Sequence, residues 1–217
     1  MNFERARFNM VEQQIRTWDV LDQRVLDVIR DTSREDYVPD AFRKLAYADI
    51  SVPLGEGEVM MPPRVEARLL QALQLKPDDR VLEVGTGSGY LTALISQLAS
   101  RVVSVEIHEV LAGRARSALE NHGIKNAVVE VGDAVHGWTR AAPYDAIAVT
   151  GSLPMMEERF QHQLTVGGRV FIIVGQAPAM EALLITRMGQ EDWATESLFE
   201  TVVPPLRGAK EPDRFVL

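Results

Sequence analysis

Three glycines on alternate positions mark the part of this chain most able to do chemistry. Gly85, Gly87 and Gly89 follow a short apolar run, and leucine and isoleucine at helical spacing come after them. This pattern predicts a buried strand, a tight turn and a helix. Glycine lets the turn adopt positive φ and lets a ligand approach the main chain, and the first helical turn offers unpaired N–H groups and a partial positive charge. The stretch therefore indicates a site for a nucleotide-like ligand; a glycine-rich turn with no ligand is the alternative.

The spacing of the glycines narrows the kind of nucleotide. A dinucleotide site has its third glycine three positions after the second, where this chain has Tyr90, and no lysine follows Gly89 as a phosphate loop requires. The E-x-G-x-G-x-G form, which begins at Glu83, instead resembles motif I of the class I S-adenosylmethionine-dependent methyltransferases. The resemblance implies a turn that packs against a ligand with a ribose but no phosphate.

Acidic residues end the next two apolar runs. Glu106 lies at roughly the twenty-residue spacing at which an acidic side chain meets ribose hydroxyls in this architecture. Its carboxylate can accept from both hydroxyls; a solvent-facing glutamate at a strand end is the alternative. The third run ends in Gly132-Asp133-Ala134. Class I methyltransferases place an acidic group near the adenine at this point, although Gly-Asp is also common in turns.

The composition excludes several classes of function. The 217 residues carry a net charge of −8 and no cysteine, which excludes disulfides, thiolate chemistry and a zinc site built on sulfur. The four histidines show no metal-ligand spacing, so we expect no metal. With no basic run, no apolar signal core and no segment of membrane-spanning length, we expect no nucleic-acid partner, no membrane and a cytoplasmic enzyme.

Strand and helix patterns alternate from residue 80 onward. They predict an α/β fold with a Rossmann-like, doubly wound, mostly parallel sheet, covered on both faces, with antiparallel C-terminal strands and an N-terminal helical cap. The expected strands after Glu106 cover 126–131, 144–150, 169–174 and a terminal pair at 182–188 and 196–203. The expected helices cover 3–30, with Asp19 as a cap, 64–75, 109–121 and 155–163.

We expect one methyltransferase domain over residues 1–217. Residues 1–79 form the helical cap and acceptor loop, 80–203 the Rossmann-like cofactor-binding core, and 204–217 a proline-rich tail over the surface. The apolar cap helices can pack inside one chain or between two, so the expected state is a monomer or weak homodimer.

From about residue 10 to 208 the chain resembles the protein-L-isoaspartate O-methyltransferase family. The elements that carry the resemblance are Met10-Val11, Ser33–Pro39, Ala46–Ile50, Val52–Gly57, Val81–Tyr90, Ala142–Thr150 and Leu164–Arg169. The Ala-Tyr-x-Asp and Pro-Leu-Gly-x-Gly elements are more specific than the glycine motif. The resemblance implies methylation of the carboxylate of isoaspartyl residues in proteins or peptides, with S-adenosyl-L-methionine as cofactor and S-adenosyl-L-homocysteine as product.

The family's next element, a Gly-Gln-Thr-Ile-Ser-x-Pro loop, differs in this chain. Val59 replaces the threonine and Met61 replaces the serine, which the family uses in catalysis. The catalytic residue is therefore unknown, and Asp49 and Ser152 are the candidates. Three functions stay open: isoaspartyl methylation, methyl transfer to another acceptor, and a non-catalytic cofactor-binding module.

The resemblance also assigns residues to the two ligands. The residues expected at the cofactor are Met60, Met61, Glu83, Gly85, Thr86, Gly87, Ser88, Gly89, Glu106, Gly132, Asp133 and Ala134. The residues expected around the methyl acceptor are Val59, Met61, Arg64 and Thr150.

Overall fold

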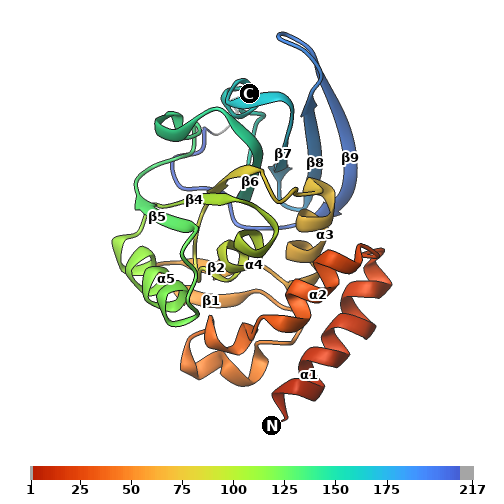
Figure 1. Ribbon diagram of the computed structural model, residues 1–217, viewed down its shortest axis with the longest axis vertical. Helices are drawn as coiled ribbons and strands as arrows, with labels where there is room; N and C mark the ends of the chain where they lie inside the picture. Colours follow the sequence, from red (N-terminus) through yellow and green to blue (C-terminus); the bar gives the residue numbers. More distant parts are fainter. Residues whose placement is uncertain (1, 211–217) are drawn as a thin grey trace, which may run out of the picture.

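A seven-stranded sheet forms the centre of the computed structural model, which describes residues 2–210 (Figure 1). Its strands are β3 (Arg80–Val84), β4 (Arg101–Glu106), β5 (Ala127–Val131), β6 (Tyr144–Leu153), β7 (Leu164–Gln176), β8 (Ala179–Arg187) and β9 (Trp193–Thr201). The order β5-β4-β3-β6-β7-β8-β9 is parallel from β5 to β7 and antiparallel from β7 to β9. The Rossmann-like sheet and its antiparallel C-terminal strands are therefore confirmed.

The strand order reverses beside β3. The chain runs from β3 to β4 and β5 on one side, and then returns to place β6 on the other side of β3. In open α/β sheets, ligands bind beyond the carboxyl ends of the strands at such a switch point. The glycine turn follows β3 directly, so the predicted ligand-binding turn lies at this point.

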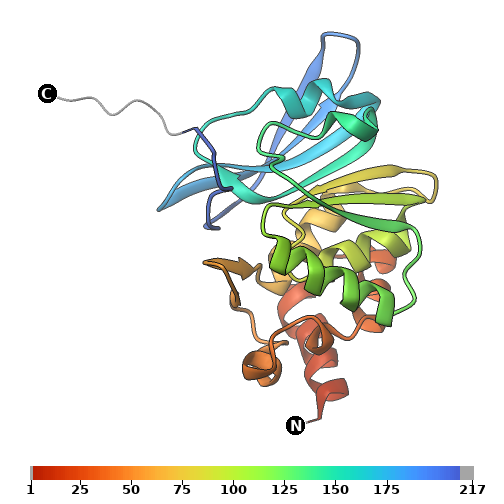
Figure 2. The same cartoon turned by 90° about the vertical axis from the view of Figure 1, so that its left-hand side faces the viewer.

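The two faces of the sheet are covered unequally. The helices are α1 (Phe3–Asn9), α2 (Gln23–Asp31), α3 (Pro63–Leu73), α4 (Tyr90–Leu98), α5 (Glu109–Asn121) and the short α6 (Arg159–His162). In one apolar core, the helices α2, α3, α4 and α5 pack against alternate strand residues such as Val81, Val102 and Phe171. The opposite core, around Leu82 and Val149, is closed by α6 and the segment before β6. Figure 2 shows the cap helices and α4 and α5 on one side of the sheet.

The N-terminal cap is less regular than the helical stretch expected over residues 3–30. A π-helical segment (Met10–Ile15) and a 3-10 turn (Arg16–Trp18) separate α1 from α2. Asp19 adopts a left-handed conformation with φ of 59° and ends that turn, whereas Asp22 accepts from the Arg24 N–H and caps α2. The expected cap at Asp19 is therefore wrong by three residues. Likewise, α6 is shorter than the expected helix over 155–163.

A hairpin and a returning segment complete the molecule beside the sheet. The hairpin pairs β1 (Val52–Gly55) with β2 (Glu58–Met60), and 3-10 turns cover Arg34–Asp36, Asp40–Leu45 and Thr139–Ala141. After β9, the main chain pairs with β6: the Ser152 N–H donates to Pro204 O and the Leu206 N–H to Ser152 O, both at 2.9 Å. The described part of the expected surface tail thus runs along the switch point, next to the hairpin (Figure 2).

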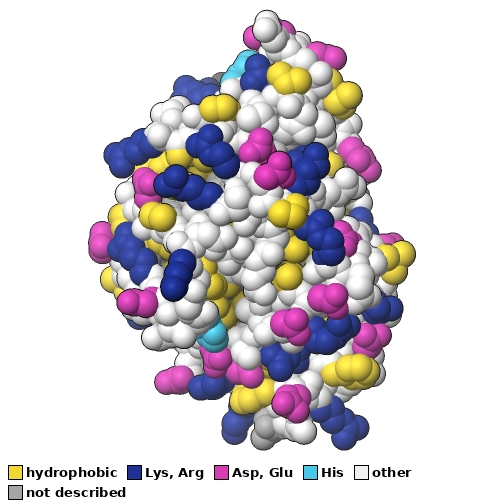
Figure 3. Space-filling view, in the orientation of Figure 1, with side chains coloured by type: hydrophobic (Ala, Val, Ile, Leu, Met, Phe, Trp, Pro, Cys, Tyr) yellow, Lys and Arg dark blue, Asp and Glu magenta, His cyan; other side chains and the backbone are white. Residues whose placement is uncertain are grey.

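Acidic and basic side chains are both scattered over the face that Figure 3 shows. In the described chain, no helix is long and apolar enough to cross a membrane. Within residues 2–210, no three histidine, aspartate or glutamate side chains gather in a way that could hold a metal ion.

Candidate active site

The glycine turn forms one wall of a cavity at the switch point. The Gly85 N–H donates to Val105 O at 2.8 Å, which ties the turn to β4. Gly85 has a φ of +93°, and a Cβ there would collide with the Thr150 hydroxyl oxygen. That oxygen lies 2.8 Å from the carbonyl oxygens of both Val84 and Gly85. Glycine is therefore required at position 85 by its backbone conformation and by the close approach of β6.

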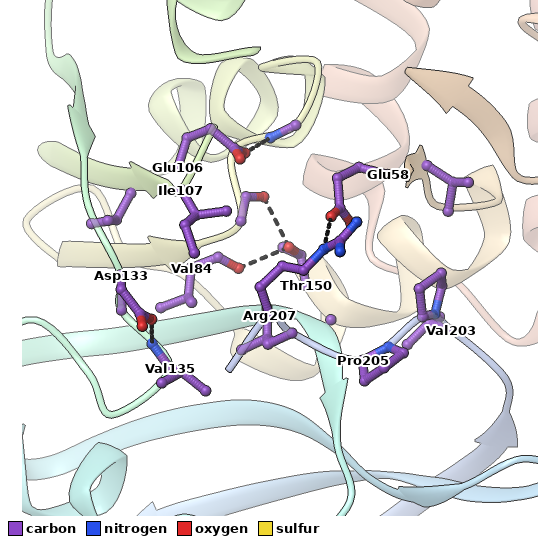
Figure 4. Close-up of a pocket in the computed structure, with 18 of the residues that line it drawn as sticks. Glu58, Val84, Glu106, Ile107, Asp133, Val135, Thr150, Val203, Pro205 and Arg207 are labelled. Atoms are coloured by element: carbon purple, nitrogen blue, oxygen red, sulfur yellow. Dashed lines mark hydrogen bonds and ion pairs between the residues drawn. The ribbon is translucent and has the colours of Figure 1, made fainter. Parts of the chain in front are cut away.

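Glu106 lies across the turn from Thr150. Its side chain is buried, and its two carboxylate oxygens accept the N–H groups of Gly87 at 2.8 Å and His108 at 3.0 Å. Each carboxylate oxygen has a second lone-pair direction, so both can also accept a ligand hydroxyl. Asp133 accepts the Val135 N–H at 3.0 Å and faces the same cavity. Figure 4 shows Glu106 and Asp133 along one side of the cavity.

Glu83 lies deeper, where the turn meets α4. One of its oxygens accepts the hydroxyls of Ser104, at 2.6 Å, and of Thr92. The other oxygen is buried without a partner, and the side chain lines an inner pocket beside the glycine turn. Burial raises the pKa of Glu83 to about 8, although the Ser104 and Thr92 hydroxyls oppose the shift. A buried carboxyl oxygen without a partner fits a ligand that brings a donor, such as an amino group.

A buried ion pair lies beneath the acceptor loop. The Arg34 guanidinium donates to the Glu66 carboxylate and, at 2.6 Å, to the carbonyl oxygen of Met61, and it lies 4.7 Å from the centre of the Tyr90 ring. Burial raises the pKa of Glu66 to about 7, against the lowering effect of Arg34. This pair fixes the main chain at Met61. The sequence analysis assigned no role to either residue, because their contact joins segments that are 32 residues apart.

Most residues expected at the cofactor line the outer cavity or the inner pocket. These are Met60, Met61, Glu83, Gly85, Thr86, Gly87, Ser88, Glu106, Gly132, Asp133 and Ala134. The exception is Gly89, which lines neither. It begins α4 with a φ of 82°, and a Cβ there would lie 3.1 Å from Ala115 of α5. Its place is explained by helix packing rather than by a ligand contact.

The residues expected around the acceptor divide into two groups. Val59, Met61 and Thr150 line the cavity. Arg64 does not: it pairs with Asp49 at 2.6 Å and lies 4.2 Å from the centre of the Trp18 ring. The candidate catalytic residue Asp49 is therefore paired with Arg64, and neither residue is among those that line the cavity.

Ser152 is also turned away from the cavity. Its side chain is fully buried, and its hydroxyl donates to Val203 O at 3.0 Å. The structure therefore does not support a role for this hydroxyl in place of the missing loop serine.

The sequence analysis missed several residues of the cavity wall that carry a polar or charged side chain or come from the tail. Among them, Ser51 directly precedes the hairpin, Glu58 begins its second strand, and Leu206 and Arg207 belong to the returning C-terminal segment. Ser51 is exposed and lines the same cavity as Val59 and Met61, so it offers a hydroxyl on a wall where the loop has lost two. No local pattern marks these residues, because only the folding of the tail along β6 brings the two segments together.

The reversal beside β3, the glycine turn and the acidic residues after the neighbouring strands define a Rossmann-like, S-adenosylmethionine-dependent methyltransferase. The sequence profile described as protein-L-isoaspartate(D-aspartate) O-methyltransferase matches residues 5–210. The chain therefore belongs to this family of O-methyltransferases, which use S-adenosylmethionine.

Two relatives can be aligned with this chain over nearly its whole length. The chain is 40% identical to protein-L-isoaspartate O-methyltransferase 2 of Pelobacter propionicus, with 96% of this chain and 93% of the relative covered. It is 39% identical to the protein-L-isoaspartate O-methyltransferase of Rhodopseudomonas palustris, with 93% of each chain covered.

Solved structures share the fold. A protein-L-isoaspartate O-methyltransferase matches with a TM-score of 0.80 and 25% identity, over 93% of this chain and 66% of that one. A putative Plasmodium falciparum protein-L-isoaspartate O-methyltransferase, in complex with S-adenosyl-L-homocysteine, matches with a TM-score of 0.78 and 19% identity, over 95% and 99% of the two chains.

Proposed function

We propose that this protein methylates the free carboxylate of L-isoaspartyl residues in peptides or proteins. The observation that carries the proposal is the shared cavity: the glycine turn, Glu106 and Asp133 form one part of its wall, and the acceptor loop at Val59 and Met61 forms another. A methyl donor and a methyl acceptor placed there would be close together. The relatives over nearly the full length of the chain carry the name of this activity.

The residues at the turn suit the cofactor group by group. We infer that Glu106 accepts from the ribose hydroxyls, that Asp133 lies beside the adenine with Gly132 and Ala134, and that Gly85 and Gly87 lie against the nucleoside. The unpartnered oxygen of Glu83 suits the amino group at the methionine end. Met60, Met61, Thr86 and Ser88 line the inner pocket at that end. When bound, S-adenosylmethionine supplies a methyl group on a positively charged sulfur.

Methyl transfer to a carboxylate depends more on the positioning of the acceptor than on acid–base catalysis. A carboxylate is ionised at pH 7 because its ordinary pKa is near 4, so no side chain has to remove a proton. Val59 and Met61 keep water from the acceptor, and orientation within the cavity supplies most of the rate enhancement. The loss of the two loop hydroxyls lowers this rate without removing the reaction.

We infer that residues 1–217 work as one unit. In this arrangement the cap and hairpin of residues 1–79 bring the acceptor to the core of residues 80–203, and residues 204–210 close the cavity. The last seven residues lie outside the described part of the chain. We infer that the protein is a monomer or a weak homodimer, which sedimentation velocity tests. Its partners in this proposal are peptides or proteins, and neither nucleic acid nor a membrane. A cytoplasmic location remains an expectation from the sequence.

A methyl-transfer assay tests the proposed function. Purified protein is incubated with S-adenosylmethionine carrying a labelled methyl group and with an isoaspartyl peptide or its aspartyl twin. We expect label in the isoaspartyl peptide alone, and release of that label as methanol in mild base, because the product is an ester. Equal labelling of the twin, or base-stable label, would contradict the proposal. Saturable cofactor binding without any transfer would leave only a binding role.

A further inference from the structure

Among the described residues that line the cavity, Arg207 is the one cation. The lining also contains three carboxylates, from Glu58, Glu106 and Asp133. An acceptor that is itself a carboxylate must enter against this negative charge, and like charges that approach closely repel. A cation on the cavity wall offsets the repulsion only for an anionic acceptor.

Most other described side chains considered for the acceptor have no free donor or lie outside the cavity. Val59 and Met61 have no polar hydrogen, Arg64 is paired outside the cavity, and the Ser152 hydroxyl is buried. The Thr150 oxygen lies within hydrogen-bond distance of two main-chain carbonyls. Besides Arg207, the described wall offers the exposed hydroxyl of Ser51, which directly precedes the hairpin.

In this structure Arg207 is held by a carboxylate of the hairpin. Its Nε donates to Glu58 Oε1 at 2.8 Å, a contact between positions 149 residues apart (Figure 4). Its Nη2 donates to Glu56 O at 2.9 Å. The Arg207 side chain is about half exposed, at 53%. Such exposed ion pairs contribute only about 0–1 kcal/mol, so another carboxylate can replace Glu58 at small cost.

Glu58 keeps a second partner when it releases Arg207. His108 Nε2 lies 3.2 Å from the same Glu58 oxygen. The hairpin carboxylate is therefore not left without a neighbour when the arginine turns to a ligand. His108 follows Glu106 closely and donates its main-chain N–H to that side chain, so this second partner is fixed to the cofactor side of the cavity.

We propose that Arg207 binds the carboxylate of the isoaspartyl acceptor, and that Glu58 competes with the acceptor for the same guanidinium. This inference rests on the proposed function. Methylation converts the acceptor from an anion to a neutral ester, which loses the charge-assisted hydrogen bond to Arg207. Glu58 then recovers the arginine as the product leaves. Arg207 thereby selects an anionic acceptor and favours release of the ester.

Two substitutions with opposite expected effects test the exchange. Arg207→Gln removes the charge, and we expect the KM for an isoaspartyl peptide to rise about five- to twentyfold, since a half-exposed contact with a charged group is being lost. The kcat does not fall, because the contact is strongest with the unreacted acceptor. Glu58→Gln removes the competitor, and we expect the KM to fall roughly two- to fivefold. Arg207→Lys, which keeps the charge but not the fork, gives an intermediate KM.

Binding measurements separate this role from a structural one. Calorimetric titration of the peptide into protein saturated with S-adenosyl-L-homocysteine should reproduce both changes, while the affinity for that product stays within about twofold. Arg16→Gln, which disturbs the exposed pair with Glu12 on the cap, is the matched control and should change neither.

Several results would overturn the inference. If Arg207→Gln and Glu58→Gln raise the KM alike, the pair only closes the cavity. If the wild-type protein methylates the peptide and the Arg207→Gln variant has the same KM, the inference about Arg207 is rejected and the proposed function stands. A wild-type protein that neither methylates nor binds the peptide rejects the proposed function together with it.

Discussion

Replacement of Glu106 by glutamine should weaken cofactor binding by roughly ten- to a hundredfold. Both carboxylate oxygens accept main-chain N–H groups, from Gly87 at 2.8 Å and His108 at 3.0 Å. An amide has one oxygen and one NH2, so in the variant one of these N–H groups must face another donor. The ribose also loses a charged acceptor. A hydrogen bond to a charged group contributes about 1.5–3 kcal/mol, and each 1.4 kcal/mol is a factor of ten in affinity.

The assay is calorimetric titration with S-adenosyl-L-homocysteine, which binds without turnover. Glu109→Gln is the matched control, because it makes the same chemical change three residues away on an exposed side chain and should leave the affinity unchanged. We also expect the Tm of Glu106→Gln to fall by about 2–8 °C, since 1 kcal/mol corresponds to about 2–4 °C in a chain of this size. Binding within twofold of wild type by a folded Glu106→Gln would refute the assignment of Glu106 to the ribose.

Three further predictions concern the loop and the buried carboxyls. Burial raises the pKa of Glu83 from 4.5 to about 8, so the folded state holds a proton that the unfolded state releases. The associated stability is full below about pH 4.5 and is lost as the pH rises through about 8. Urea unfolding should therefore show a smaller loss between about pH 5 and pH 9 in Glu83→Gln than in wild type; equal slopes would contradict this. Restoring both loop hydroxyls, with Val59→Thr and Met61→Ser, should raise kcat/KM for the isoaspartyl peptide by about tenfold or more; no gain would refute the account of the loop. Arg34→Gln leaves the Glu66 carboxyl without its cation and should lower the free energy of unfolding by about 3–5 kcal/mol in denaturant titrations, because the pair is fully buried; a loss below 1 kcal/mol would contradict that reasoning.

Periodicity predicted the sheet because its strands are continuous apolar runs. The strand over 126–131 and the helix over 109–121 match β5 and α5 to within one residue. One side of each element is buried, at Val129 in β5 and at Leu111 and Leu119 in α5, whereas Val110, Val128 and Val131 remain exposed. The cap was harder to predict, because Asp19 and Asp22 both precede the same apolar run. Only Asp22 has the extended backbone that a helix cap requires.

The candidate site was predictable where it follows the strands. Glu106 and Asp133 could be placed because parallel strands bring their carboxyl ends to one edge of the sheet. Side chains that depend on distant partners could not. Arg64 is held by Asp49, and Arg207 reaches the hairpin only because the tail pairs with β6. Both contacts depend on the folded chain and leave no local pattern in the sequence.

A crystal structure of the protein with S-adenosyl-L-homocysteine tests the central claim most directly, that the cavity beyond β3 and β6 binds the cofactor beside the acceptor loop. The account predicts the ribose hydroxyls on Glu106, the adenine beside Asp133 and the homocysteine amino group toward Glu83. A ligand bound elsewhere, or one whose ribose does not contact Glu106, would contradict the account.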